Sequence, residues 1–175
     1  MNNKIMVRIA TKQDAPLIAL LGRITFTETF GHFFRYKNDL LEYYDQTFSV
    51  TKIKKGLENS DNIFWLAFVN ELPVAYAKLK LNSKSAFSQS ENICQLQKIY
   101  VLSNFISMKI GFKLQSILID KAKENQFDEI WLSVLESNDR AIRFYEKNDF
   151  KSVGNHNFQI GKENFEFIAM SKRLK

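Results

Sequence analysis

Apolar and polar residues alternate along the chain in two rhythms, one typical of helices and the other of strands. A short β-branched segment at Met6–Ala10 predicts a first strand. Thr11 and Asp14 follow with the spacing of a capping box, which favours a helix immediately afterwards. The apolar residues that recur at helical spacing there, and that we expect to face the core, are Leu17, Leu20, Leu21 and Ile24.

The middle of the chain changes from helical to strand patterning. Leu40–Phe48 predicts a second helix, and Ser49 has the type and place of a cap for a third. The apolar run Ile63–Val69 and the alternating segment Val74–Leu81, joined by Asn70-Glu71, predict a hairpin. The serine-rich stretch 82–92 predicts a loop. The remaining expected elements are strands at Ile93–Leu102, Asp128–Leu135, Phe150–Gln159 and Phe165–Ser171, and helices at Gly111–Asn125 and Asp139–Asn148.

The segment Ile93–Leu135 is a strand–helix–strand unit, which requires two parallel strands and a right-handed crossover. Neither a repeat nor a linker interrupts the chain, and 175 residues fit one domain, so we expect a single mixed α/β domain over residues 1–175.

Composition narrows the classes of function. One cysteine, Cys94, and two histidines offer neither a disulfide nor a metal cluster. No long apolar stretch or signal-peptide core is visible, so we expect a soluble, cytoplasmic protein without membrane contact. The net charge is +6, but the lysines are dispersed, and the group Lys52, Lys54 and Lys55 is expected to be a solvated surface. Without a basic aromatic cluster, nucleic-acid binding is not expected.

Two segments carry candidate chemistry. In the first, a strand ending near Leu102 feeds a helix that opens at Gly111, and free N–H groups at such an opening can bind pyrophosphate, with Lys109 adding a cation. The alternative is that this segment only connects a strand to a helix and binds no ligand. In the second, Asn138, Ala141 and Tyr145 lie close to one helix face. The alternative is that Asn138 is only a cap and Tyr145 only part of the core.

The second segment, a strand followed by N-x-x-A-x-x-F-Y and a Phe-led strand, resembles the GNAT superfamily of acyl-CoA-dependent N-acyltransferases. The L-x-K-I-Y-V run and the helix-opening loop are similar to its pyrophosphate motif. The resemblance covers nearly the whole chain. Within the superfamily, Thr25–Phe30 and Gly154–Gly161 are similar to the bacterial spermidine/spermine N-acetyltransferase branch. The resemblance to the superfamily implies a GNAT-type α/β fold, with a mixed, largely antiparallel sheet of six to seven strands flanked by helices.

The resemblance also implies acetyl-CoA as the cofactor, with CoA as the product. The strand before the loop would pair through its backbone with the pantetheine arm, and the loop would wrap the pyrophosphate. Tyr145 would act as a catalytic acid that protonates the departing thiolate. The implied cofactor-binding residues are Ile99, Tyr100, Val101, Ile106, Ser107, Met108, Lys109, Ile110, Gly111, Asn138 and Tyr145.

Two positions depart from the family pattern. Lys109 stands where the loop usually has glycine, and Asp149 stands where glycine usually precedes the final Phe. Lysine lacks the conformational freedom of glycine, although backbone donors survive the substitution. We therefore expect a changed loop and a changed turn, and an effect on cofactor affinity, within an unchanged fold.

The acceptor side offers fewer signals. A protonated amine must lose a proton before it attacks a thioester. Family members use a Glu or His at the positions held here by Gln95 and Gln97, which we expect to line the substrate site without acting as bases. Glu28 is our candidate for both catalysis and substrate binding. His156 is interpreted mainly as structural, and a water chain is a further route for the proton.

These features predict an acetyl-CoA-dependent N-acetyltransferase that acts on a small primary amine in a ternary complex, as a monomer or homodimer. The branch resemblance favours a polyamine. The positive net charge opposes a polycation unless acidic residues gather into a mouth. Acetylation of a protein N-terminus or an amino-sugar is one alternative, and an acyl-CoA-binding module without turnover is another. The residues that would form the acidic mouth are Glu28, Asp39, Glu42 and Asp45.

Overall fold

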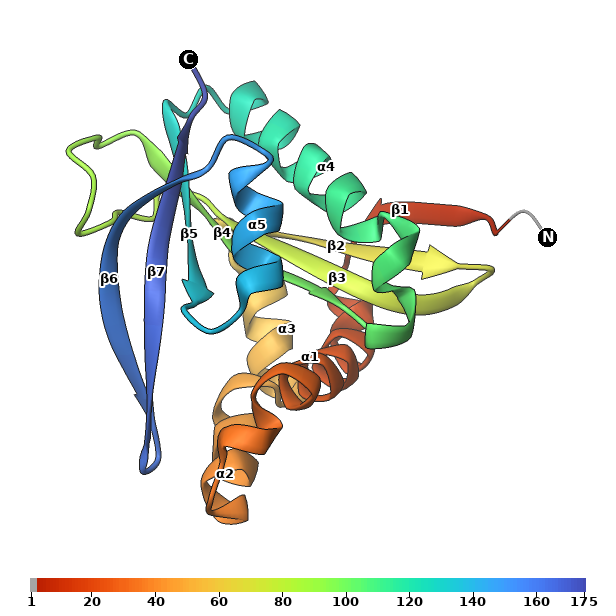
Figure 1. The fold of residues 1–175 in the computed structure, drawn as a ribbon. Helices are drawn as coiled ribbons and strands as arrows, with labels where there is room; N and C mark the ends of the chain where they lie inside the picture. Colours follow the sequence, from red (N-terminus) through yellow and green to blue (C-terminus); the bar gives the residue numbers. More distant parts are fainter. Residues whose placement is uncertain (1–2) are drawn as a thin grey trace.

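The structure is a computed structural model that describes residues 3–175 (Figure 1). Short 3-10 turns, labelled η, link several of its helices and strands. In chain order the elements are β1 Ile5–Ile9, η1 Lys12–Asp14, α1 Ala15–Phe30, η2 Gly31–Phe33, α2 Lys37–Thr47, α3 Val50–Glu58, β2 Asn62–Val69, β3 Leu72–Lys80, β4 Ile93–Val101, η3 Ser103–Met108, α4 Ile110–Glu124, β5 Glu129–Leu135, α5 Asp139–Glu146, β6 Lys151–Ile160 and β7 Glu163–Arg173.

The strands form one seven-stranded sheet in the order β1-β2-β3-β4-β5-β7-β6. Every neighbouring pair is antiparallel except β4 and β5, which run parallel because α4 crosses over between them. The predicted sheet of six to seven strands, largely antiparallel and flanked by helices, is confirmed.

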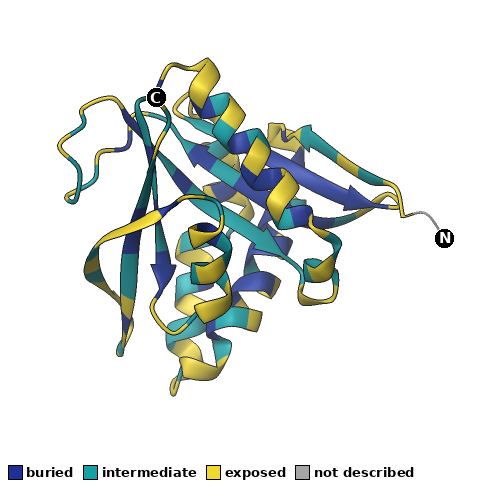
Figure 2. Ribbon diagram, turned by 45° about the horizontal axis from the view of Figure 1, so that its top comes forward, coloured by how far each residue is buried: buried dark blue, intermediate teal, exposed yellow. Residues whose placement is uncertain are grey.

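Helices cover both faces of the sheet and create two hydrophobic cores (Figure 1). On one face, α4 and α5 pack on the central strands through residues such as Leu114, Leu118 and Tyr145. On the other, α1, α2 and α3 contribute an aromatic core around Phe26 and Phe48. In Figure 2 the buried residues concentrate in the central strands and in the inner faces of these helices.

The α1 face differs from the prediction. Leu21 is buried as expected, but Leu20 and Ile24 are 58% and 39% exposed, whereas Ile18 and Phe26 are buried. Apolar residues surround this helix on most sides, so their spacing alone selects no single face. The predicted capping box is confirmed, because the Thr11 N–H donates to Asp14 Oδ2 over 2.8 Å.

The parallel strands β4 and β5 diverge along their length, and the candidate active site lies where they separate. The two strands pair only where Ile93–Gln95 lies beside Glu129–Trp131. Beyond that point β5 continues along β7, and β4 continues along β3. A β-bulge at Gln97 lies where β4 leaves its neighbour, since Lys98 pairs with Lys78 while Leu96 pairs with Leu79. Bulges bend a strand and redirect its side chains, so β4 turns away and a wedge opens.

Candidate active site

Three adjoining cavities follow the wedge across the sheet. The largest, here called the wedge cleft, has a volume of about 1110 Å³ and lies between β4, η3, α4 and α5. The junction pocket, about 310 Å³, lies deeper between the diverging strands and shares Tyr100 and Tyr145 with the wedge cleft. The lysine pocket, about 460 Å³, lies below α3 and shares Gln97 and Lys98 with the junction pocket. The junction pocket therefore adjoins both of the others.

One wall of the wedge cleft is the free edge of β4. Ile99, Tyr100 and Val101 line the cleft. Their strand retains β3 as a neighbour on one side but has no pairing with β5 on the other. An unpaired strand edge offers N–H and C=O groups to an extended ligand, as a sheet does when it accepts another strand.

The opening of α4 forms the mouth of this cleft. Lys109, the residue that precedes the helix, has φ +58° and ψ +19°, which is the left-handed conformation, and its side chain makes no capping hydrogen bond. Lys109 therefore adopts a backbone conformation that glycine reaches at no steric cost. The first N–H groups of a helix have no intrahelical acceptor. Because no side chain caps them and Lys109 lies beside them, these N–H groups are available to bind an anion.

The predicted loop residues divide between the cleft and the core. Ile106, Ser107, Lys109 and Gly111 line the wedge cleft. The side chains of Met108 and Ile110 instead pack into the core on the α4 face, so only their backbone is available to a ligand.

Gly111 leaves room in the cleft. A Cβ there would lie 3.9 Å from the Phe144 ring and 4.0 Å from Val101. These are ordinary contacts, so packing within the protein does not demand a glycine. The space that a side chain would fill is left to the wedge cleft.

The second predicted segment borders two cavities. Asn138 caps α5, accepting a hydrogen bond from the Ala141 N–H over 3.2 Å, and both residues line the wedge cleft and the junction pocket. Tyr145, two turns later, is 9% exposed and packs edge-to-face on Phe144 and Phe150. Burial raises the pKa of the Tyr145 phenol far above its usual value. The phenol is protonated at neutral pH, as an unperturbed tyrosine also is, so it holds a proton beside both cavities.

The turn after α5 contains a residue in the left-handed region. Asp149, which stands where the family resemblance implies glycine, has φ +65°. Aspartate tolerates this region better than most residues. The chain therefore forms this turn without glycine.

His156 faces the junction pocket from β6. Its Nε2 lies 2.8 Å from the Ser133 hydroxyl on β5, and its ring stacks on Phe167 at 5.5 Å. Both His156 and Ser133 line the junction pocket. Among the residues that line it, none is a carboxylate, and His156 contributes the one imidazole, a group that often acts as a general base.

Glu28 occupies a different place from the one expected of a base. Its carboxylate accepts hydrogen bonds from the Ser103 hydroxyl at 2.8 Å and from the Ser103 N–H at 3.1 Å. It is exposed and borders the wedge cleft, not the junction pocket. Glu28 thus ties α1 to η3 and lacks the burial that activates catalytic carboxylates.

The four acidic residues that were expected to gather at the entrance of a polyamine site do not come together. Asp45 pairs with Arg23, and Asp39 accepts from the Lys162 N–H, each outside the three cavities. Glu42 also borders none of them.

The two glutamines of β4 are separated by the bulge. Gln97 lines both the junction pocket and the lysine pocket. Gln95 accepts a hydrogen bond from the Ser83 hydroxyl at 3.0 Å and borders none of the three cavities. The structure therefore brings Gln97, and not Gln95, to the site.

Comparisons with known proteins agree with this geometry. The acetyltransferase (GNAT) family matches residues 25–150, which is more than half of the chain. An uncharacterized N-acetyltransferase of Lactobacillus delbrueckii subsp. lactis, encoded in the pepI 3′ region, is 23% identical over 164 residues and covers 94% of both chains. The chain therefore belongs to the GNAT acetyltransferase family.

Solved structures share the fold. PaiA N-acetyltransferase from Thermoplasma acidophilum, crystallised with coenzyme A, superposes with a TM-score of 0.77 at 20% identity, over 97% of this chain and 99% of that one. NAA60 of Arabidopsis thaliana, in complex with acetyl-CoA, gives 0.76 at 16% identity, over 97% and 98%. The chain is accordingly an acetyl-CoA-dependent N-acetyltransferase of the GNAT type.

No helix within residues 3–175 combines the length and apolar character needed to span a bilayer. Among these described residues, no cluster of three or more His, Cys, Asp and Glu side chains is placed to hold a metal ion.

Sequence reasoning missed part of the acceptor side. Lys98 and Ser133 were not expected at the site, and Lys52 was expected on a solvated surface. A signal was present, because Lys78 and Lys98 are charged residues within segments whose pattern predicts strands. Which cavity they border depends on the bulge, which the pattern of residues does not reveal.

Proposed function

We propose that this enzyme transfers the acetyl group of acetyl-CoA to a primary amine bound in the junction pocket, by direct attack in a ternary complex. The observation that carries the proposal is the divergence of β4 and β5 beyond Gln95. It leaves a free strand edge along the wedge cleft and a junction pocket between the diverging strands that adjoins this cleft. The two substrates can therefore approach each other from adjoining cavities.

The wedge cleft suits acetyl-CoA in shape and in chemistry. The free edge of β4 at Ile99–Val101 would hold the pantetheine arm by strand-like hydrogen bonds. The uncapped start of α4, with Lys109 beside it, would hold the pyrophosphate. Acetyl-CoA supplies an activated acetyl group as a thioester. The N–H groups of the β4 edge would also stabilise negative charge on its carbonyl oxygen.

Tyr145 is proposed as the acid. As the amine nitrogen forms its bond to the acetyl carbon, the carbon–sulfur bond breaks and the electron pair leaves with sulfur. Tyr145 borders both the wedge cleft and the junction pocket, and its phenol is protonated at neutral pH. Donation of that proton would neutralise the departing thiolate.

His156 is proposed as the group that takes the proton from the amine. It lies in the junction pocket, and its hydrogen bond to Ser133 and its stacking on Phe167 fix the ring. Neutral imidazole accepts a proton near pH 7, which Gln97 cannot do. This proposal replaces Glu28, whose carboxylate is engaged by Ser103.

A polyamine acceptor stays a prediction from the branch resemblance, and the site does not favour it. The pocket next to the junction pocket is lined by lysines and by no carboxylate. A polycation would meet like charges there. Acetylation of a peptide N-terminus or an amino-sugar remains compatible with a primary amine in the junction pocket.

The test is a panel of primary amines with acetyl-CoA, measured by release of free thiol and by mass of the amine product. We expect amine-dependent thiol release matched by an acetylated product. Binding of acetyl-CoA without thiol release for any amine would instead identify an acyl-CoA-binding module.

A further inference from the structure

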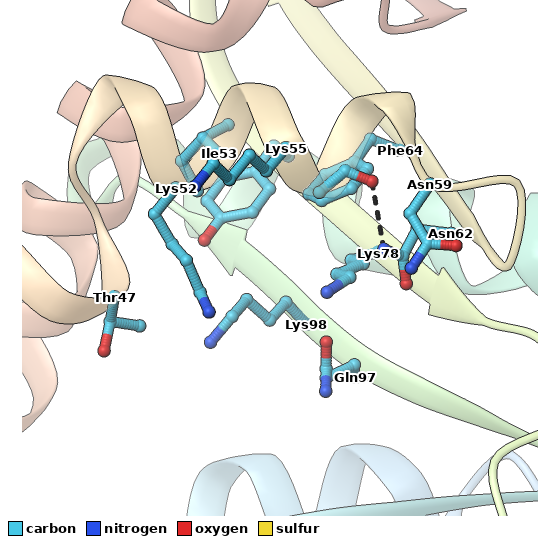
Figure 3. A pocket seen from close by; sticks show the side chains of 12 residues that line it. Thr47, Lys52, Ile53, Lys55, Asn59, Asn62, Phe64, Lys78, Gln97 and Lys98 are labelled. Atoms are coloured by element: carbon cyan, nitrogen blue, oxygen red, sulfur yellow. Dashed lines mark hydrogen bonds between the residues drawn. The ribbon is translucent and has the colours of Figure 1, made fainter.

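The lysine pocket lies between α3 and the middle of the sheet (Figure 3). Its positive residues come from three elements: Lys52 and Lys55 from α3, Lys78 from β3 and Lys98 from β4. In Figure 3 the ammonium ends of Lys52 and Lys98 point toward each other across the cavity, and the end of Lys78 points into the same space. Residues far apart in the sequence thus concentrate positive charge in one place.

These charges have no acidic partner in the described part of the chain. None of the seven ion pairs found in residues 3–175 includes a lysine of the pocket, and no Asp or Glu lines it. The contacts that support them are aromatic faces. Lys78 Nζ lies 5.2 Å from the centre of the Phe64 ring, and Lys98 Nζ lies 5.1 Å from that of Tyr100. Aromatic faces attract a cation but leave its hydrogen-bond donors free.

The electrostatic repulsion among these lysines is visible in the pKa of Lys78. Burial, followed by repulsion from Lys98, Lys80 and Lys52, lowers the pKa of Lys78 to about 8. Burial likewise lowers the pKa of Lys98. A fold that brings several unneutralised lysines together is destabilised by them, and an anion bound among them relieves the repulsion.

A second, independent feature lies in the same wall. Tyr76 is fully buried and lines the lysine pocket, and its hydroxyl has no hydrogen-bond partner within residues 3–175. Buried hydroxyls are nearly always paired, so an unpaired one is unfavourable. The wall of the pocket therefore contains a polar group whose hydrogen-bonding capacity is unused.

We propose that the acceptor amine carries an anionic group, a carboxylate or a phosphate, which the lysine pocket binds while the amine lies in the junction pocket. This inference rests on the proposed function, since the junction pocket is where the amine is placed. Gln97 and Lys98 border both pockets, so the two pockets adjoin, and an acceptor that extends past these side chains would reach from one to the other. The chemistry that recognises the acceptor is then oxyanion binding by ammonium groups.

The test compares amines that differ in their far end. One series is butylamine, 4-aminobutyrate and 1,4-diaminobutane, which end in a methyl group, a carboxylate and a second ammonium. The other is ethanolamine and O-phosphoethanolamine, which tests phosphate. With the enzyme and saturating acetyl-CoA, we expect kcat/KM to be higher for an anionic amine by about tenfold or more than for its neutral partner. We expect 1,4-diaminobutane to be the poorest substrate of its series.

Two variants and a matched control link this preference to the pocket. Lys52→Gln and Lys78→Gln each remove one positive charge from its wall, and both should reduce the preference for the anionic amine. Lys54→Gln removes the same charge from the same helix as Lys52, but Lys54 is exposed and borders none of the three cavities, so it should keep the preference. Lys52 lies on the exposed side of α3, so its variant is expected to fold even if the strand variant does not.

Coenzyme A affinity, measured by calorimetry on each variant, separates this inference from the proposed function. The lysines that are changed do not border the wedge cleft, so coenzyme A should bind equally to all variants. Coenzyme A binding and turnover with no preference for anionic amines, or a preference that survives both pocket variants, would overturn the anionic acceptor alone. Thiol release that is fastest with 1,4-diaminobutane would overturn it in favour of a polyamine. Absence of coenzyme A binding would overturn the proposed function, and this inference with it.

Discussion

Replacing Lys109 by glycine should separate the backbone strain at this position from the proposed contribution of its side chain to pyrophosphate binding. In the free enzyme, Lys109 holds a left-handed conformation with φ +58°. That conformation costs an L-residue about 1–2 kcal/mol, and the greater chain entropy of glycine offsets about 0.5–1 kcal/mol of the gain. Lys109→Gly should therefore stabilise the free enzyme by about 1 kcal/mol. For a chain of this length the corresponding rise in Tm is about 2–4 °C.

The same substitution should weaken cofactor binding. A hydrogen bond to a charged group contributes about 1.5–3 kcal/mol, which corresponds to an increase in Kd of about 10- to 100-fold. At a coenzyme A concentration about 100 times the wild-type Kd, a tenfold weaker variant is stabilised by about 1.4 kcal/mol instead of about 2.7 kcal/mol. Thermal unfolding with and without coenzyme A measures both effects.

Gln126→Gly is the matched control. Gln126 also has positive φ, +61°, and is exposed at a turn that borders none of the three cavities. It should raise the Tm of the free enzyme and leave the coenzyme A response unchanged. A Lys109→Gly enzyme that binds coenzyme A as tightly as the wild type would refute the assignment of Lys109 to the pyrophosphate. A lower Tm for the free variant would refute the argument from backbone strain.

Three further predictions concern the acid, the base and the N-terminal ion pair. Tyr145→Phe should lower turnover by about 10²–10⁴-fold with coenzyme A affinity unchanged, because it removes only the proton donor; unchanged turnover would place Tyr145 in the core alone. His156→Gln should lower turnover by about 10²-fold more than Glu28→Gln does, and the opposite order in steady-state assays would return the role of base to Glu28. Arg8, paired with Asp14 at 2.8 Å, lowers the pKa of that carboxyl to about 2. Because the folded pKa lies below the unfolded one, this stability is present above about pH 4 and is lost between about pH 4 and 2. Allowing for the exposure of Arg8, the loss is about 1–2 kcal/mol in urea unfolding. Asp14→Asn should be less stable at neutral pH and lack this loss, and an unchanged acid profile would contradict the ion pair.

The order of elements was predictable from the sequence because strand and helix periods differ and because turn and cap residues mark their ends. The strand predicted at Ile93–Leu102 is observed at Ile93–Val101, and the helix predicted at Gly111–Asn125 is observed at Ile110–Glu124. The inward face of α1 was not predictable, since exposed Leu20 and buried Leu21 are equally apolar. Burial there depends on what packs against the helix, and periodicity carries no such information.

The parts of the candidate site that helix openings form were predictable from the sequence. The part that depends on the β-bulge was not. The α5 cap at Asn138 and the α4 opening at Gly111 follow from local sequence signals. Gln95 and Gln97 were expected side by side at the acceptor site. The extra residue of the bulge directs only Gln97 to that site and places Lys98 beside it. A single-residue insertion in a strand leaves no signature in composition or period.

The central claim is that the divergence of β4 and β5 lets acetyl-CoA and an amine meet where two cavities adjoin. Its most direct measurement is single-turnover mass spectrometry with isotopically labelled acetyl-CoA and the amine panel, in which labelled product and free thiol are counted together. The account predicts one labelled amide for each thiol released, and no thiol release when the amine is omitted. Thiol release without labelled amide, or coenzyme A binding that no amine converts into release, would contradict it.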